Sequence, residues 1–343
     1  MSKLPLLATL TALGAGPALA EVPRVVTDIA PVHSLTAQVM QGLGEPVLLV
    51  KPGQSPHSYA LRPSEARALQ DAGLVVWVGH ELAPWLEKPL EALAGKAELL
   101  ELLDGAGTVA RPYRGAADIL AEADHGSEGH DDHDDHAGHD DHDDHAAAEQ
   151  DHDHDHAAAA GDDGHNHDHS GRDPHAWLDP ENGKIWLGLI ADRLAALDPE
   201  HAETYRANAA AGQARIDAVE QGLTAELQPM QGVPFVSYHD AFQYFELRYG
   251  LTLVGRVTAS DAADPSPAQL AQLRDRLDDL GVRCAFTEPQ FDTRLLQAAV
   301  EGRDIPILEL DPLGRDLTPG AGLYPALLED VGASFAACAA TLK

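Results

Sequence analysis

Residues 24–53 read RVVTDIAPVHSLTAQVMQGLGEPVLLVKPG, and this stretch decides the fold. Two short runs rich in β-branched residues, RVVTDIAPV and EPVLLVKPG, enclose a stretch of helical character at 35–41. A third run, GLVVWVG at 73–79, follows a second helical stretch at 63–71. Strands that alternate with helices are typical of βαβ units, so we expect an α/β fold with a mostly parallel sheet.

The same alternation returns in the last third of the chain. The runs VPFVSYH, LTLVGRV, VRCAFTE and IPILELD begin at residues 233, 251, 282 and 305. Between the two α/β regions, residues 199–229 are rich in alanine and charge, and they predict a helix about 40 Å long. We therefore expect an N-terminal lobe at 21–198, a rigid linking helix at 199–229 and a C-terminal lobe at 230–343, with a cleft between the lobes.

The first twenty residues, MSKLPLLATLTALGAGPALA, predict a secretory signal peptide. We expect cleavage near Ala20 and a soluble periplasmic protein, because no later apolar run is long enough to span a bilayer. The leader has no cysteine for a lipid anchor, which disfavours a surface adhesin. The two cysteines, Cys284 and Cys338, indicate a disulfide in an exported protein, and two buried free thiols are the alternative. A metal site made of cysteines is not expected, because the sequence has no CxxC spacing.

Acidic residues dominate the charge of the chain, and they are unevenly placed. The formal net charge is −33, and residues 124–169 hold 17 Asp and Glu without one Lys or Arg. This balance excludes nucleic-acid binding and disfavours anionic membranes. Residues 124–171, which we call the His-rich segment, predict a disordered loop inserted in the N-terminal lobe that binds several zinc ions weakly. It contains 13 of the 19 histidines: His125, His130, His133, His136, His139, His142, His145, His152, His154, His156, His165, His167 and His169.

Six histidines lie outside this segment, and three of them have the context of metal ligands. His57, His175 and His239 each stand in a loop at a strand end or a helix entry, where the backbone is fixed and the imidazole can face a cleft. Two come from the first lobe and one from the second, so we expect a site between the lobes. Of the others, His33 follows the first strand and is expected to line the cleft, His80 is a weaker ligand candidate and His201 is expected to be exposed.

Five motifs carry a family resemblance: SPHSYALRPSEARALQDAGLVVWVG, DPHAWLDP, VSYHDAFQYFELRYGL, TEPQF and LDPLG, in this order around the acidic insertion. Together they resemble the ZnuA family, the zinc-specific solute-binding proteins of ATP-binding-cassette importers. The resemblance implies two lobes joined by a long helix, one tight zinc ion held by His57, His175 and His239, and a disulfide between Cys284 and Cys338.

The fourth zinc ligand is left open by the resemblance. Some relatives carry a glutamate immediately before the first ligand histidine, where this chain has Pro56, and others use an aspartate that matches Asp311. Either Asp311 or a water molecule therefore completes the expected tetrahedron.

Three imidazoles with at most one oxygen favour zinc over manganese, which prefers more carboxylates. We expect that the chain is not an enzyme, because the sequence contains no HExxH helix or other catalytic signature. The expected partners are the inner-membrane permease of the importer and a periplasmic zinc chaperone, and we expect a monomer. The alternatives are a zinc-dependent hydrolase or hydratase, since three histidines and a water also form catalytic zinc sites, and a binding protein for another divalent metal such as manganese.

Overall fold

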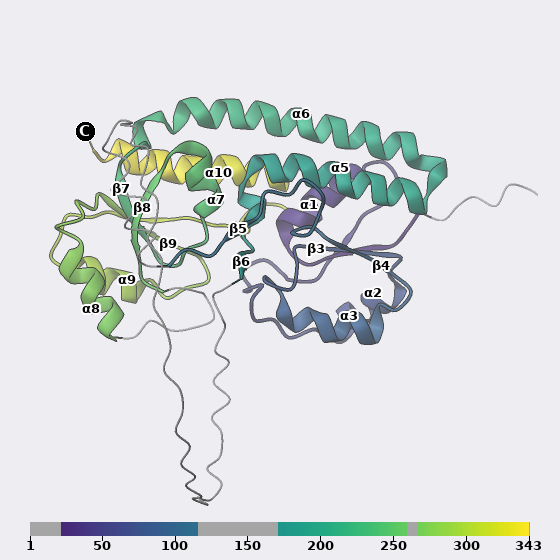
Figure 1. Ribbon diagram of the computed structural model, residues 1–343, viewed down its shortest axis with the longest axis horizontal. Helices are drawn as coiled ribbons and strands as arrows, with labels where there is room; N and C mark the ends of the chain where they lie inside the picture. The colour runs from purple at the N-terminus through teal and green to yellow at the C-terminus, as the bar shows by residue number, and fades with distance from the viewer. Residues whose placement is uncertain (1–21, 116–170, 259–266, 343) are drawn as a thin grey trace, which may run out of the picture.

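The structure is a computed structural model that describes residues 22–115, 171–258 and 267–342 (Figure 1). The expected signal peptide and residues 124–170 of the His-rich segment lie outside the described residues. No helix in the described ranges is long and apolar enough to cross a membrane.

The N-terminal half forms a four-stranded parallel sheet in the order β2-β1-β3-β4. Its strands are β1 (Val25–Thr27), β2 (Val47–Leu48), β3 (Leu74–Trp77) and β4 (Glu98–Glu101), with helices α1 (Ala30–Val39), α2 (Pro63–Asp71) and α3 (Glu87–Leu93). Strand β3 is buried at every position because helices cover both faces of a parallel sheet. Residues 24–53 form the predicted order of strand, helix and strand, but α1 begins at Ala30, within the run predicted to be extended.

A second parallel sheet in the order β10-β9-β7-β8 forms the C-terminal half. Its strands are β7 (Pro234–Ser237), β8 (Thr252–Arg256), β9 (Cys284–Thr287) and β10 (Ile307–Glu309), with helices α7 (Gln243–Tyr249), α8 (Pro267–Arg276) and α9 (Thr293–Val300). The two sheets lie at opposite ends of an elongated molecule (Figure 1). The predicted α/β class with mostly parallel sheets is confirmed.

Two long helices lie along one side of the molecule, and the longer one joins the halves. Helix α5 (Pro180–Leu197) packs against α6 (Ala202–Glu226), and α6 runs above both sheets in Figure 1. The Asp179 carboxylate caps α5 by accepting from the Glu181 amide at 3.0 Å. Single 3₁₀ turns at Pro199–His201 and Gln228–Met230 flank α6, so the helical stretch that the composition predicts is α-helical only over its middle part.

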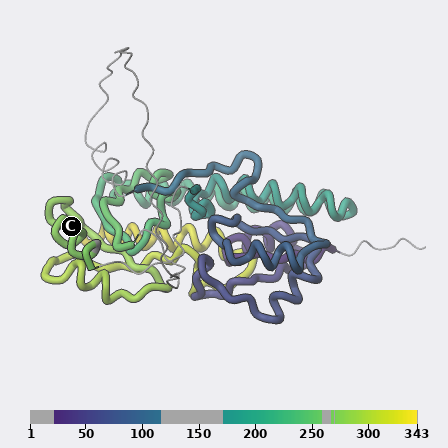
Figure 2. Tube along the Cα trace, turned by 60° about the horizontal axis from the view of Figure 1, so that its bottom comes forward, coloured from purple at the N-terminus to yellow at the C-terminus, as the bar shows by residue number. Residues whose placement is uncertain are grey.

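A third helix, α10 (Leu323–Ala340), also bridges the two halves, and the prediction of one linking helix did not include it. Near its start, the Tyr324 amide donates to the Ser34 hydroxyl of α1 at 2.8 Å, and the Tyr324 hydroxyl donates to the Trp177 carbonyl at 2.7 Å. Near its end, Cys338 is bonded to Cys284 of β9, which confirms the expected disulfide. Figures 1 and 2 show α10 running beneath α6 from the C-terminal sheet to the middle of the molecule.

The apolar core continues from one half into the other. One cluster of buried side chains includes Val25 of β1, Trp186 of α5, Phe235 of β7 and Phe335 of α10. Gly183 of α5 permits this close packing, because a Cβ there would lie 2.3 Å from the Tyr324 hydroxyl oxygen. The halves therefore share packing as well as chain connections, which favours small relative movements.

Removing the disulfide should destabilise the fold. The bridge joins residues separated by 54 positions, so it restricts the unfolded chain considerably. The double variant Cys284→Ala/Cys338→Ala should lose about 2–4 kcal/mol of unfolding free energy. Denaturant unfolding of the oxidised protein, the reduced protein and the double variant checks this. Equal stability of all three would show that the bridge contributes nothing.

Candidate metal centre

His239 stands just beyond the carboxyl end of β7, and its ring is oriented by a buried glutamate. His239 is 3% exposed, and its Nδ1 lies 2.5 Å from Glu288 Oε1, just after β9. The other carboxylate oxygen of Glu288 accepts from the Gln290 amide group at 3.0 Å. Because a carboxylate only accepts hydrogen bonds, Nδ1 of His239 carries the proton, and Nε2 is left with a lone pair.

His175 is oriented in the same way from the N-terminal half. It precedes the 3₁₀ turn Ala176–Leu178 and is 4% exposed. Asp173 Oδ1 lies 2.7 Å from Nδ1 of His175 and also accepts from the His175 amide at 3.0 Å. The Nε2 atom of His175 is therefore also an acceptor.

The two Nε2 atoms face one another at a distance of 3.4 Å. With both protons placed on Nδ1, no hydrogen lies between these nitrogens, and their lone pairs repel each other. A tetrahedron with Zn–N bonds of about 2.0–2.1 Å has edges of about 3.3–3.4 Å. The spacing between His175 and His239 is therefore that of two ligands on one zinc ion, and a cation between them would turn the repulsion into attraction.

His57 brings a third imidazole to the same place. Its ring centroid lies 5.4 Å from that of His175, which in turn lies 5.2 Å from that of His239. The loop after β2 is held by the Trp85 indole, which donates to the Pro56 carbonyl at 2.7 Å. The structure thus gathers the three predicted histidines, with His175 in the middle, and leaves His57 half-buried at the outer side.

Asp311, the predicted alternative to a water ligand, is engaged in its own loop. Its carboxylate accepts from the backbone amides of Leu313 and Gly314 at 3.0 Å each, and from that of Arg315. The loop lies next to the metal centre, since the Trp177 indole donates to the Pro312 carbonyl at 2.7 Å. These amides compete with a metal for the same oxygens, so a role of Asp311 as fourth ligand stays a prediction.

A short antiparallel pair of strands, the β5–β6 pair, holds Asp173 in position. It consists of β5 (Arg111–Pro112) and β6 (Arg172–Asp173) and lies between the two sheets (Figure 1). The Tyr244 hydroxyl in α7 donates to the Asp173 carbonyl at 2.8 Å and accepts from the Arg111 amide at 2.9 Å. The carboxylate that orients His175 is therefore held by the half of the molecule that carries His239.

A buried ion cluster provides a second connection between the β5–β6 pair and the C-terminal half. Arg114, just after β5, pairs with Asp240 and Glu246, and all three side chains are almost completely buried. Arg256 donates to the second oxygen of Asp240 at 2.8 Å. Asp240 directly follows His239. The cluster therefore connects Arg114, just after β5, to the backbone next to a candidate ligand.

The three other histidines are used elsewhere. The His33 ring bonds the Pro46 carbonyl at 3.1 Å, and burial lowers the pKa of this imidazole, so it is a core histidine of the N-terminal half. His201 lies at the start of α6 and pairs with Asp198. His80 pairs with Glu81 and Glu101.

Sequence reasoning missed the two orienting carboxylates. Asp173 stands two positions before His175, and Glu288 belongs to the TEPQF motif at the end of β9. Two signals were available in the sequence. One is an acidic residue close to a candidate ligand, and the other is a glutamate directly after a buried strand.

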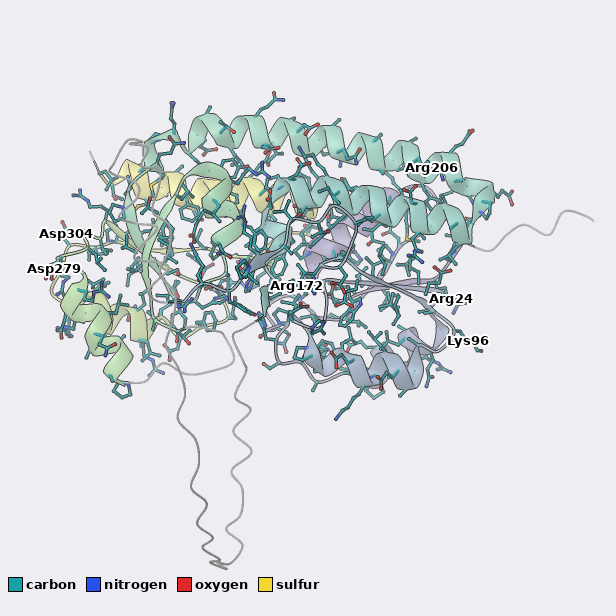
Figure 3. All side chains as sticks on the ribbon, viewed as in Figure 1. Arg24, Lys96, Arg172, Arg206, Asp279 and Asp304 are labelled. Atoms are coloured by element: carbon teal, nitrogen blue, oxygen red, sulfur yellow. A yellow bond between two sulfur atoms is a disulfide. The ribbon has the colours of Figure 1, made fainter. Side chains whose placement is uncertain are left out.

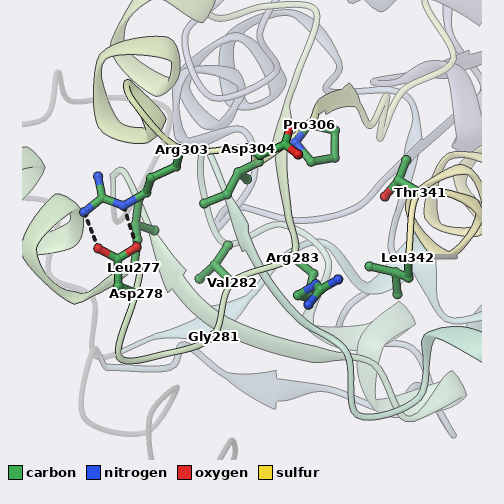
Figure 4. Close-up of a pocket in the computed structure, with 11 residues that line it drawn as sticks. Leu277, Asp278, Gly281, Val282, Arg283, Arg303, Asp304, Pro306, Thr341 and Leu342 are labelled. Carbon is green, nitrogen blue, oxygen red and sulfur yellow. Dashed lines mark hydrogen bonds and ion pairs between the residues drawn. The ribbon is translucent and has the colours of Figure 1, made fainter.

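A pocket in the C-terminal half is unrelated to this centre. It has a volume of about 720 Å³ and includes Val282, Arg283 and Pro306, with Arg303 paired to Asp278 on one side (Figure 4). It opens at the amino ends of β9 and β10, whereas the histidines and Glu288 stand at the carboxyl ends of the strands. Ligands of parallel sheets bind at the carboxyl ends, so the histidines mark the site.

Several known proteins that are similar to this chain are named as zinc-uptake components. The family model of the periplasmic zinc-uptake complex component A, ZnuA, matches residues 25–338. The high-affinity zinc uptake system protein ZnuA of Paracoccus denitrificans is 46% identical over 323 residues, covering 94% of this chain and 93% of that protein. Its counterpart from Brucella abortus is 40% identical over 314 residues, covering 92% and 91%. A crystal structure of ZnuA has the same fold, with a TM-score of 0.67 at 23% identity, covering 92% of this chain and 99% of that chain.

Weakening the support of His239 should weaken zinc binding without removing a ligand. Glu288→Gln keeps the size of the side chain but removes the charge that makes the imidazole basic, so the tightest zinc affinity should fall about tenfold or more. Competition with a chelator at less than one zinc per chain measures this site alone. Glu301→Gln, an exposed residue paired with Arg274, is the matched control. Equal affinities in the two variants would contradict the orienting role.

Proposed function

Because the chain belongs to the ZnuA family of periplasmic zinc-uptake components, we propose that it captures zinc in the periplasm and delivers it to an ATP-binding-cassette importer in the membrane. The observation that carries this proposal is the pair of Nε2 atoms of His175 and His239, 3.4 Å apart, with both Nδ1 atoms bound to carboxylates. Such a pair is prepared for a cation before the cation arrives.

The donor set favours zinc. His175 and His239 supply two neutral nitrogens, His57 supplies a third after a small adjustment of its ring, and water or Asp311 supplies the fourth position. Zinc prefers four nitrogen and oxygen ligands in a tetrahedron, whereas manganese prefers more oxygens. The carboxylates of Asp173 and Glu288 add negative charge behind the rings, which offsets part of the charge of the ion.

The site is built from both halves of the molecule, and this arrangement suits capture and release. His57 and His175 come from the N-terminal half and His239 from the C-terminal half, so a small relative movement changes the ligand geometry. Helices α6 and α10 limit that movement, because both run across the two halves. We infer that release to the permease uses a local shift at the ligands rather than a wide opening of the lobes.

The His-rich segment is the proposed gathering device. Its 13 histidines and many carboxylates should bind several zinc ions more weakly than the ordered centre, because an unstructured chain must be ordered by the ion. Zinc collected there would then pass to His57, His175 and His239, which are already in place.

We further propose the finer points of this role: export with cleavage near Ala20, a monomer, an inner-membrane permease as partner and a periplasmic zinc chaperone as a second partner. A binding role also means that the zinc-loaded chain has no catalytic activity. Ester hydrolysis or CO₂ hydration above the rate of free zinc would instead favour the hydrolase or hydratase alternative.

Removing a central ligand should abolish the tight site. His239→Ala should lose the tightest zinc in chelator competition, since only the weaker groups of the chain remain. His201→Ala, which removes an imidazole at the start of α6, should keep the wild-type affinity. If His239→Ala binds the first zinc as tightly as the wild type, the cleft is not the capture site.

Deleting residues 124–169 should separate the two classes of zinc site. The shortened chain should keep one tight zinc per molecule with the wild-type affinity and lose the weaker ions that the His-rich segment binds. Isothermal titration calorimetry of both chains measures the stoichiometry. If the shortened chain binds no zinc tightly, the capture site lies in the His-rich segment and not at the three histidines.

A further inference from the structure

A second group of metal-ligating side chains lies at the carboxyl edge of the N-terminal sheet. His80 and Glu81 follow β3, and Glu101 is the last residue of β4. Strands β3 and β4 pair in parallel, so their carboxyl ends meet at the same edge. None of these residues contributes to the centre formed by the three gathered histidines.

The donor atoms of this group have the spacing of ligands on one ion. His80 Nδ1 lies 3.1 Å from Glu101 Oε1 and 3.3 Å from Glu81 Oε2. One donor atom from each of the three residues lies within 4.8 Å of the others. Edges of about 3.3–3.4 Å belong to a tetrahedron with zinc bonds of about 2.0–2.1 Å. A single divalent ion can therefore touch all three after small side-chain adjustments.

One of these atoms lacks the hydrogen bond that its burial demands. The Glu81 side chain is only 10% exposed, and its buried Oε2 makes no hydrogen bond among the described residues, its ion-pair partner being His80 Nδ1 at 3.3 Å. The other oxygen, Oε1, accepts from Arg172 Nε at 2.7 Å. A buried carboxylate oxygen without a donor costs free energy, and a cation at this point would remove that cost.

The group has more negative than positive charge around it, which favours a cation. Arg172 is bonded to Glu81 and Asp104, so one positive charge faces the three carboxylates of Glu81, Asp104 and Glu101. Arg172 approaches Glu81 on the oxygen that points away from His80. The side that faces His80 and Glu101 therefore keeps a surplus of negative charge.

A glycine makes the close approach of the carboxylates possible. Gly79 has a φ of 152°, and a Cβ at this position would lie 2.7 Å from Glu101 Oε1 and 3.1 Å from Glu81 Oε2. Any other residue would push the carboxylates away from the His80 backbone. The amide of His80 itself donates to Glu101 Oε1 at 3.1 Å, which holds the glutamate in place.

We propose that His80, Glu81 and Glu101 form a second site for a zinc-sized divalent cation, separate from the centre at His175 and His239. The ion replaces the proton of His80 Nδ1 and takes one oxygen from each glutamate, and water fills the position toward solvent, where His80 is 51% exposed. Arg172 of β6 links this site to the β5–β6 pair, which also carries Asp173. Figure 3 shows Arg172 near the middle of the molecule, between the two sheets. The site does not depend on the proposed transport role.

Anomalous diffraction at the zinc edge, from crystals of the full chain soaked in excess zinc chloride, tests the proposal. The wild type should show a peak about 2.0–2.2 Å from His80 Nδ1 and from an oxygen of each glutamate. His80→Gln and Glu101→Gln should lose this peak and keep the peak at His175 and His239, which also shows that they fold. Glu98→Gln, on the same strand but paired with Arg193, should keep both peaks.

Two results would overturn the proposal: no peak at His80 in the wild type, or a peak that Glu101→Gln leaves unchanged. Because the two centres give separate peaks, failure here is distinguishable from failure of the proposed zinc-capture function. A solution measurement covers variants that do not crystallise. Zinc titration of ¹⁵N-labelled protein should shift the His80 amide resonance in the wild type and Glu98→Gln, but not in Glu101→Gln. An equal shift in Glu101→Gln would contradict the assignment.

Discussion

Two imidazole nitrogens that face each other at 3.4 Å are the constraint on which the rest of the structure depends. Two lone pairs at this distance repel, and only the surrounding protein keeps them there. Asp173 and Glu288 hold the protons on the far sides of the rings, so the nitrogens cannot relieve the repulsion by sharing a hydrogen. Both Nε2 atoms are therefore available to a cation, and the carboxylates behind the rings offset part of its charge.

The scaffold is organised to maintain that arrangement between two separate sheets. Helices α6 and α10 cross from one half to the other, and the disulfide ties the end of α10 to β9. The β5–β6 pair connects the two halves close to the site, because Tyr244 and the Arg114 cluster bind it to the C-terminal half. A rigid frame of this kind lowers the ordering cost of binding, since most of the ligand geometry exists before zinc arrives.

The sequence predicted those parts of the structure that depend on local pattern. Alternating strands and helices gave both parallel sheets, and the motif resemblance selected His57, His175 and His239 from 19 histidines. The bridging role of α10 could not be predicted, because it depends on Tyr324 meeting Ser34 and Trp177, which are distant in sequence. The same applies to Glu288 and His239, which meet only because β7 and β9 are neighbours in the sheet. The resemblance also gave Asp311 as a possible ligand, but not the hydrogen bonds that its oxygens accept from backbone amides of its own loop.

The most direct test of the central claim is the position of the first zinc ion, located by anomalous diffraction from the full chain loaded with one equivalent. We expect a single peak about 2.0–2.1 Å from Nε2 of both His175 and His239. A first ion bound elsewhere, with these two rings still hydrogen-bonded to their carboxylates and no density between them, would contradict it.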